Sequence, residues 1–139
     1  MRLGGRISAA IEVLEEVETR HRPVSEALKD WGVAHRFAGS GDRAVIGNIV
    51  YDALRWRASS AWLAGDDGAR GVVLAMLAHR WKLGLAGIEQ ALAADPHAPA
   101  SLTADERQRL EHTDLAGAPA HVDADVPECT ATHLDALFG

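Results

Sequence analysis

Apolar residues recur three and four positions apart along most of this chain, without the sustained alternation that marks a half-buried strand. The clearest case is the segment 43–57, where one half of a helical circumference is apolar: Val45, Ile46, Ile49, Val50, Ala53 and Leu54. Trp56 falls just inside the edge of this arc and is expected in the core, whereas Tyr51 lies outside it. The pattern predicts an all-α fold, a bundle of about six to eight helices.

The other helices follow from the same spacing and from capping signals. Gly32 after Trp31 is typical of a helix C-terminus, and Asp67 is a candidate N-cap. The Gly39–Asp42 stretch is expected to cap the helix over 43–57 through Ser40 or Asp42. A capping box at Thr103 and Glu106 begins a short polar helix. The remaining predicted helices cover residues 4–21, 24–31, 58–64, 69–82, 85–94 and 104–112.

A length of 139 residues is enough for one domain, 1–139. Within it we expect a main bundle over 1–94, a polar acidic extension over 95–126, and a final helix over 127–139 that begins at Pro127. Leu134, Leu137 and Phe138 place an apolar stripe at the very end of that helix. Because such a stripe packs on something, we expect the chain to be the front piece of a longer polypeptide with a further domain behind it.

Charge is distributed unevenly along the chain, although its net value is −6. Residues 1–82 carry 12 basic and 10 acidic side chains, and residues 83–139 carry 2 and 10. Arginines outnumber lysines 12 to 2, and a guanidinium suits bidentate phosphate contacts and stacking on bases. A polyanion would therefore bind first to the part of the chain over residues 1–82. Arginine-rich surfaces also occur in proteins whose arginines only form ion pairs, so the composition leaves both interpretations open.

The composition narrows the class of protein. With 47% apolar residues the chain can fill a core, and no apolar run approaches the roughly 20 residues that cross a bilayer. Cys129, the one cysteine, excludes an internal disulfide. We expect a soluble, cytoplasmic protein without a membrane partner.

No pattern in the sequence indicates catalysis by this chain alone. Gly39-Ser40-Gly41 lacks the strand before it that a nucleotide-binding loop requires, so a turn is the simpler interpretation. Cys129 and His133 stand four residues apart on the predicted last helix, but two ligands without a third are a weak signal for a metal or a catalytic dyad. We therefore expect no catalytic residue and no metal site.

The segment DRAVIGNIVYDALRWR at 42–57 resembles the third helix of the NusB-like N-terminal domain found in the Sun family of ribosomal RNA cytosine-5 methyltransferases. Neighbouring features agree in order and spacing: Arg6, Ala9 and Leu14, the run 57–62, Pro127-Glu128, Leu134 and Phe138-Gly139. The chain departs from the family pattern at Cys129, where a tryptophan is expected, and at Trp56, where a basic residue is expected.

This resemblance implies a helical bundle that binds ribosomal RNA and precedes a methyltransferase domain using S-adenosylmethionine, with no cofactor in this chain. Cys129 is then not a catalytic cysteine, because the catalytic residues belong to the missing domain. The expected phosphate contacts come from arginines near helix ends, converging on one cationic face: Arg2, Arg6, Arg36, Arg43, Arg55 and Arg57. If six such contacts form, the slope of log affinity against log salt should be roughly −4 to −5.

Two other functions remain open. A protein-interaction module would use an apolar groove of the bundle and bind without salt dependence. Docking onto the catalytic domain of the same polypeptide would change enzyme stability but not RNA affinity. An independent enzyme is the weakest alternative.

Overall fold

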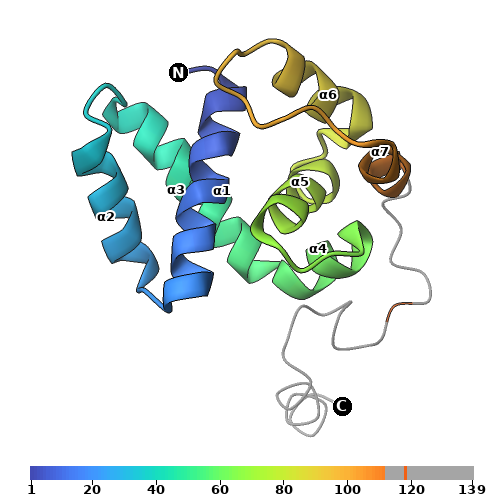
Figure 1. Cartoon of the computed structure of the whole chain (residues 1–139), viewed down its shortest axis with the longest axis horizontal. Helices are drawn as coiled ribbons and strands as arrows, with labels where there is room; N and C mark the ends of the chain where they lie inside the picture. The colour runs from blue at the N-terminus through green and yellow to red at the C-terminus, as the bar shows by residue number, and fades with distance from the viewer. Residues whose placement is uncertain (112–117, 119–139) are drawn as a thin grey trace, which may run out of the picture.

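The computed structural model describes residues 1–111 and residue 118 of the chain, and within these it contains seven α-helices and no strand (Figure 1). The helices are α1 (Leu3–Arg20), α2 (Val24–Ala34), α3 (Ser40–Arg55), α4 (Arg57–Ala64), α5 (Ala69–His79), α6 (Gly84–Ala93) and α7 (Ala104–Glu111). The predicted all-α bundle of about six to eight helices is thus confirmed. The predicted final helix from Pro127 lies outside the described residues.

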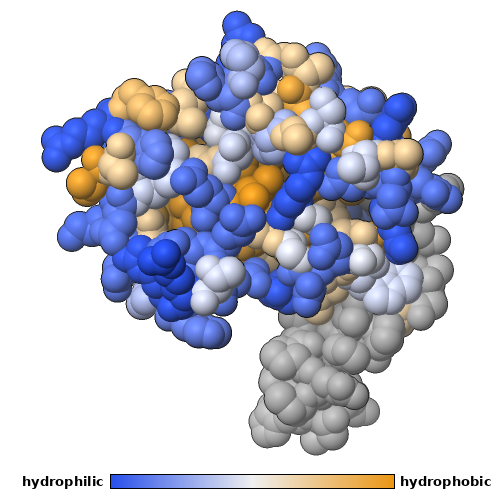
Figure 2. Space-filling view, viewed as in Figure 1, coloured by the Kyte–Doolittle hydropathy of each residue, from blue (hydrophilic) through white to orange (hydrophobic). Residues whose placement is uncertain are grey.

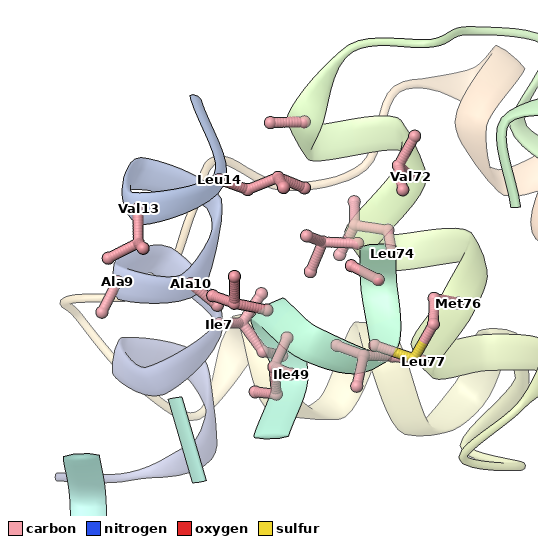
Figure 3. Close-up of a cluster of buried hydrophobic side chains, with 14 of the residues drawn as sticks. Ile7, Ala9, Ala10, Val13, Leu14, Ile49, Val72, Leu74, Met76 and Leu77 are labelled. Carbon is pink, nitrogen blue, oxygen red and sulfur yellow. The ribbon is translucent and has the colours of Figure 1, made fainter. Parts of the chain in front are cut away.

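Helix α5 forms the centre of the bundle. Every residue from Val72 to Ala78 is buried, and a helix that is apolar on all sides is stable only when other helices surround it. It packs against α1, α3, α4, α6 and α7. Figure 3 shows Ile7 and Leu14 reaching from α1 toward Leu74 and Leu77 of α5.

Helix α2 continues one turn beyond its predicted end. Gly32 was expected to stop it after Trp31, but the helix runs on to Ala34 and Gly32 is buried inside it. A Cβ atom at position 32 would lie 3.1 Å from Cδ of Arg43. This glycine therefore allows a close approach between α2 and the side chain of Arg43 rather than ending the helix.

A break separates α3 from α4 at Trp56. Its backbone (φ −111°, ψ 34°) leaves the helical region, and its ring is partly buried against the core rather than fully enclosed in it. The guanidinium groups of Arg55 and Arg80 lie 4.9 and 5.1 Å from the ring centroid. Tyr51 is 51% exposed, as its place outside the apolar arc predicts.

The capping predictions divide into confirmed and wrong ones. The capping box is present, because Glu106 accepts a hydrogen bond from the Thr103 amide (2.9 Å) and donates its own amide to Thr103 Oγ1 (3.1 Å). The helix predicted to begin at 43 begins at Ser40, so its N-cap is Gly39, and Asp42 contributes from within the first turn by accepting from the Gly39 amide (3.3 Å). Asp67 is not an N-cap, because Gly68 takes that position. Across the described residues, none of the helices combines the length and apolar character that a bilayer crossing demands.

Candidate nucleic-acid interface

Arg6, on the first turns of α1, is bound to a carboxylate. Its Nε and Nη2 atoms both donate to Asp42 Oδ1, at 2.9 and 2.7 Å. The Arg6 guanidinium, with help from the Gly39 amide, holds the pKa of Asp42 below its ordinary value. The pair ties α1 to the start of α3, so the charge of Arg6 is compensated within the fold.

Arg57 is also compensated. It begins α4 and donates from Nε and Nη2 to Glu18 at the C-terminal end of α1, with Nη2 to Oε2 at 2.6 Å. Glu18 raises the pKa of this guanidinium, and Nη2 also donates to the Asp67 carbonyl at 3.2 Å. The contact fastens the α3–α4 junction to α1.

Arg2 and Arg55 are exposed, but each guanidinium contacts an uncharged group of the protein. Arg2 Nη1 donates to the Ala94 carbonyl at 2.5 Å, which leaves its other donors directed to solvent. Arg55 lies over the Trp56 ring at the far end of α3. Twelve residues of helix separate Arg55 from Arg43, which is about 18 Å along the axis. Arg55 and Arg57 therefore belong to a different end of the bundle from Arg43.

Arg36 and Arg43 are brought together by the turn between α2 and α3. Both are exposed and line one open surface depression, together with Gly32, Val33 and Ala38. In the part of the chain that the structure describes, neither guanidinium makes an ion pair or a side-chain hydrogen bond. Two uncompensated positive charges thus stand side by side at this corner.

The six predicted arginines consequently fall into two groups. Arg2, Arg6, Arg36 and Arg43 surround the N-terminal turn of α1 and the α2–α3 turn, whereas Arg55 and Arg57 lie at the α3–α4 junction. Among the residues that the structure describes, Arg6 is the one member of the first group that is held by a carboxylate.

A cleft that sequence reasoning did not identify opens beside the arginine pair. It has a volume of about 510 Å³ and lies between the N-terminal half of α1, the end of α2 with the following turn, and residues 95–97. Its aromatic wall consists of Trp31, His35 and Phe37. Figure 2 shows apolar surface at the upper left, over the connection between α2 and α3. The aromatic spacing of four and two residues was visible in the sequence, but it did not reveal the opposite wall.

The three rings are held in a fixed arrangement. Trp31 and His35 stack with centroids 4.2 Å apart and planes 9° from parallel, and Phe37 meets His35 edge to face at 5.9 Å. His35 Nδ1 lies 2.8 Å from the Trp31 carbonyl, and because a carbonyl oxygen only accepts, Nδ1 is the donor. Phe37 is nevertheless 74% exposed. The cleft therefore has a preformed aromatic wall with one ring open to solvent.

Asp95 builds the base of the cleft. Its side chain is buried, with Oδ2 accepting from the Gly5 amide at 2.6 Å and Oδ1 from the His97 amide at 2.9 Å. These two hydrogen bonds, the one from His97 first, lower its pKa. Both oxygens are thus engaged in holding the segment after α6 against α1.

Metal-binding geometry does not occur in the described residues, where no three His, Cys, Asp or Glu side chains converge. The pair Cys129 and His133 lies outside those residues. Comparisons with protein-family models, curated proteins and solved structures give no match for this chain.

Proposed function

We propose that this bundle is a non-catalytic RNA-recognition domain that positions a tethered methyltransferase domain on ribosomal RNA in the cytoplasm. The observation that carries the proposal is the uncompensated pair Arg36 and Arg43, exposed on one turn. The resemblance of segment 42–57 to the NusB-like domains of ribosomal RNA cytosine-5 methyltransferases agrees with it. S-adenosylmethionine would be bound by the tethered domain.

Uncompensated arginines favour this function for an energetic reason. A guanidinium already bonded to a carboxylate must lose that partner before it can bind a phosphate, whereas a solvated one releases only water and counterions. Arg36 and Arg43 are of the second kind, and Arg6 and Arg57 are of the first. The proposed RNA contacts are therefore Arg36 and Arg43, with Arg2 beside them.

The other three predicted arginines, Arg6, Arg55 and Arg57, are not among the proposed RNA contacts. Arg6 keeps Asp42 occupied, so that the carboxylate adjacent to Arg43 in sequence does not pair with it. Arg55 and Arg57 lie at the opposite end of α3. Three phosphate contacts instead of six lower the expected salt slope to about −2 for single-stranded RNA.

The test is a fluorescence anisotropy titration of the full chain with ribosomal RNA fragments at several salt concentrations. We expect a slope of about −2, and the double variant Arg36→Ala/Arg43→Ala should make it shallower by about 1.4 units. The control is Arg20→Ala/Arg107→Ala, which removes the same charge from exposed side chains elsewhere. A slope near zero for the unmodified chain, or equal losses in both double variants, would contradict the proposal.

A protein-interaction module is the second candidate, and one observation favours it. Val33 is 57% exposed and Phe37 74%, so the α2–α3 corner presents apolar surface beside its charges. A partner protein bound there would give an affinity that changes little with salt and falls on Val33→Ser substitution. The same titration therefore separates the two functions.

A further inference from the structure

We propose that the cleft between α1, the α2–α3 turn and residues 95–97 binds one nucleotide, and that it prefers a base with an exocyclic amino group. The preference comes from a carboxylate, Glu12, which lines the cleft and lies against Trp31 of its aromatic wall. As a subsite for an unpaired base of an RNA strand, this rests on the function proposed above.

The size and lining of the cleft suit a planar ring. A volume of about 510 Å³ lies within the range of small-molecule sites, which are mostly apolar with a few polar groups that fix orientation. Phe37 offers an aromatic face that is largely exposed, and base stacking on such faces is tolerant of sequence. Because His35 is stacked on Trp31 and bonded to its carbonyl, the wall behind Phe37 is already in place before a ligand arrives.

The two carboxylates of the cleft differ in whether their oxygens are free to accept a hydrogen bond from a ligand. Both oxygens of Asp95 are bonded to backbone amides. Glu12 Oε2 lies 3.4 Å from the donor Trp31 Nε1, and its Oε1 has no hydrogen-bond partner among the described residues. Glu12 therefore supplies a carboxylate oxygen to the cleft that remains free to accept a hydrogen bond.

A free carboxylate selects among bases by their edges. It accepts hydrogen bonds from the amino groups of cytosine, adenine and guanine. Uracil presents one ring N–H between two carbonyl oxygens, and those oxygens repel a carboxylate. Glu12 would thus favour the amino-bearing bases over uracil.

Cations are placed to meet the phosphates of such a nucleotide. Arg2 lines the cleft, with one of its donors bound to the Ala94 carbonyl. Arg36 lies between His35 and Phe37 in sequence and lines the neighbouring depression with Arg43. A strand with one base in the cleft would therefore pass Arg2, and Arg36 stands on the same turn as the aromatic wall.

The experiment compares oligocytidine and oligouridine of equal length by anisotropy, and cytidine and uridine monophosphate by calorimetry, on the full chain. We expect oligocytidine to bind about tenfold more tightly than oligouridine. Phe37→Ala should weaken both by about tenfold without changing the salt slope, whereas the control Phe37→Tyr keeps the ring and the affinity. Glu12→Gln should remove the preference for cytidine, because a carboxamide both donates and accepts.

The outcomes separate the two proposals. Salt-dependent binding with no preference for cytidine and no effect of Phe37→Ala overturns the cleft and leaves the RNA-binding function standing. Binding of cytidine monophosphate alone, without binding of either oligonucleotide, overturns the RNA-binding function and identifies a free nucleotide as the ligand of the cleft. Absence of binding by every probe overturns both. Circular dichroism confirms that each variant is folded.

Discussion

The two walls of the cleft are built in opposite ways. On the α1 side, Gly4 and Gly5 are buried, the Asp95 carboxylate bonds the backbone, and Arg6 is paired with Asp42. On the α2–α3 side, Phe37 and Arg36 are exposed, and no carboxylate compensates Arg36 within the described residues.

The α1 side therefore contributes to the stability of the fold, whereas the α2–α3 side offers groups that can bind a ligand. Paired charges and close backbone contacts fix the α1 wall, and a group engaged in this way has little left to offer a partner. On the α2–α3 side, the Phe37 ring is exposed and the Arg36 guanidinium has no partner among residues 1–111. Substitutions should accordingly affect stability at the first wall and binding at the second.

The largest effect is expected from Gly4→Ala. The added Cβ would lie 2.7 Å from the Ala91 carbonyl oxygen and 2.8 Å from Cβ of Asp95, so backbone must move. We expect a loss of about 1–3 kcal/mol in the free energy of unfolding, measured by urea denaturation. Gly41→Ala is the matched control, since nothing lies within 4 Å of its new Cβ. Equal stability of the two variants would contradict the close approach.

Asp95→Asn should come next, with a thermal midpoint lowered by several degrees, because an amide cannot accept from both backbone donors as the carboxylate does. The lowered pKa of Asp95 means that its ionised form is favoured in the folded state. Its contribution is therefore full above the ordinary aspartate pKa and is lost as the pH falls below about 4. Thermal melts between neutral and acid pH should show a flatter profile in the variant than in the unmodified chain.

A paired and an unpaired arginine should then respond differently to the same change. Arg6→Ala removes the partner of Asp42 and should lower the thermal midpoint by a few degrees, whereas Arg36→Ala should leave it unchanged. RNA affinity should show the reverse order. If Arg36→Ala destabilised the fold as much as Arg6→Ala, the distinction between the two walls would fail.

The smallest effect is expected from Gly32→Ala. The new Cβ meets only the flexible side chain of Arg43, at 3.1 Å, while alanine is the better helix former. We expect a gain of up to about 1 kcal/mol in stability by urea denaturation. Because Arg43 must move, RNA affinity should fall slightly in the same variant. A loss of stability would mean that Arg43 is held more rigidly than its exposure implies.

Local pattern predicted the helices well, and it was wrong where a residue had a distant neighbour. The apolar face of α3 and the Thr103–Glu106 capping box could be read from spacing alone, since the interactions involved are a few residues apart, but the predicted bounds 43–57 differ from the observed Ser40–Arg55. The prediction that Gly32 ends its helix was wrong, because this glycine makes room for the side chain of Arg43, which lies on another helix. The partner of Arg57 could not be read from the sequence, because Glu18 lies 39 residues away and only the fold brings the two side chains together.

The order of residues was enough to predict a helical chain, the apolar faces of its helices and the abundance of arginines in its first part. Only the folded structure shows which of the described guanidinium groups form ion pairs with carboxylates. The fold also brings Asp95 to the Gly5 amide of α1 and Glu12 to the Trp31 side chain. Helix formation and capping depend on neighbours within about four residues along the chain, so they can be predicted from the sequence. Ion pairing and cleft formation depend on distances in space, and these are set by the packing of the core.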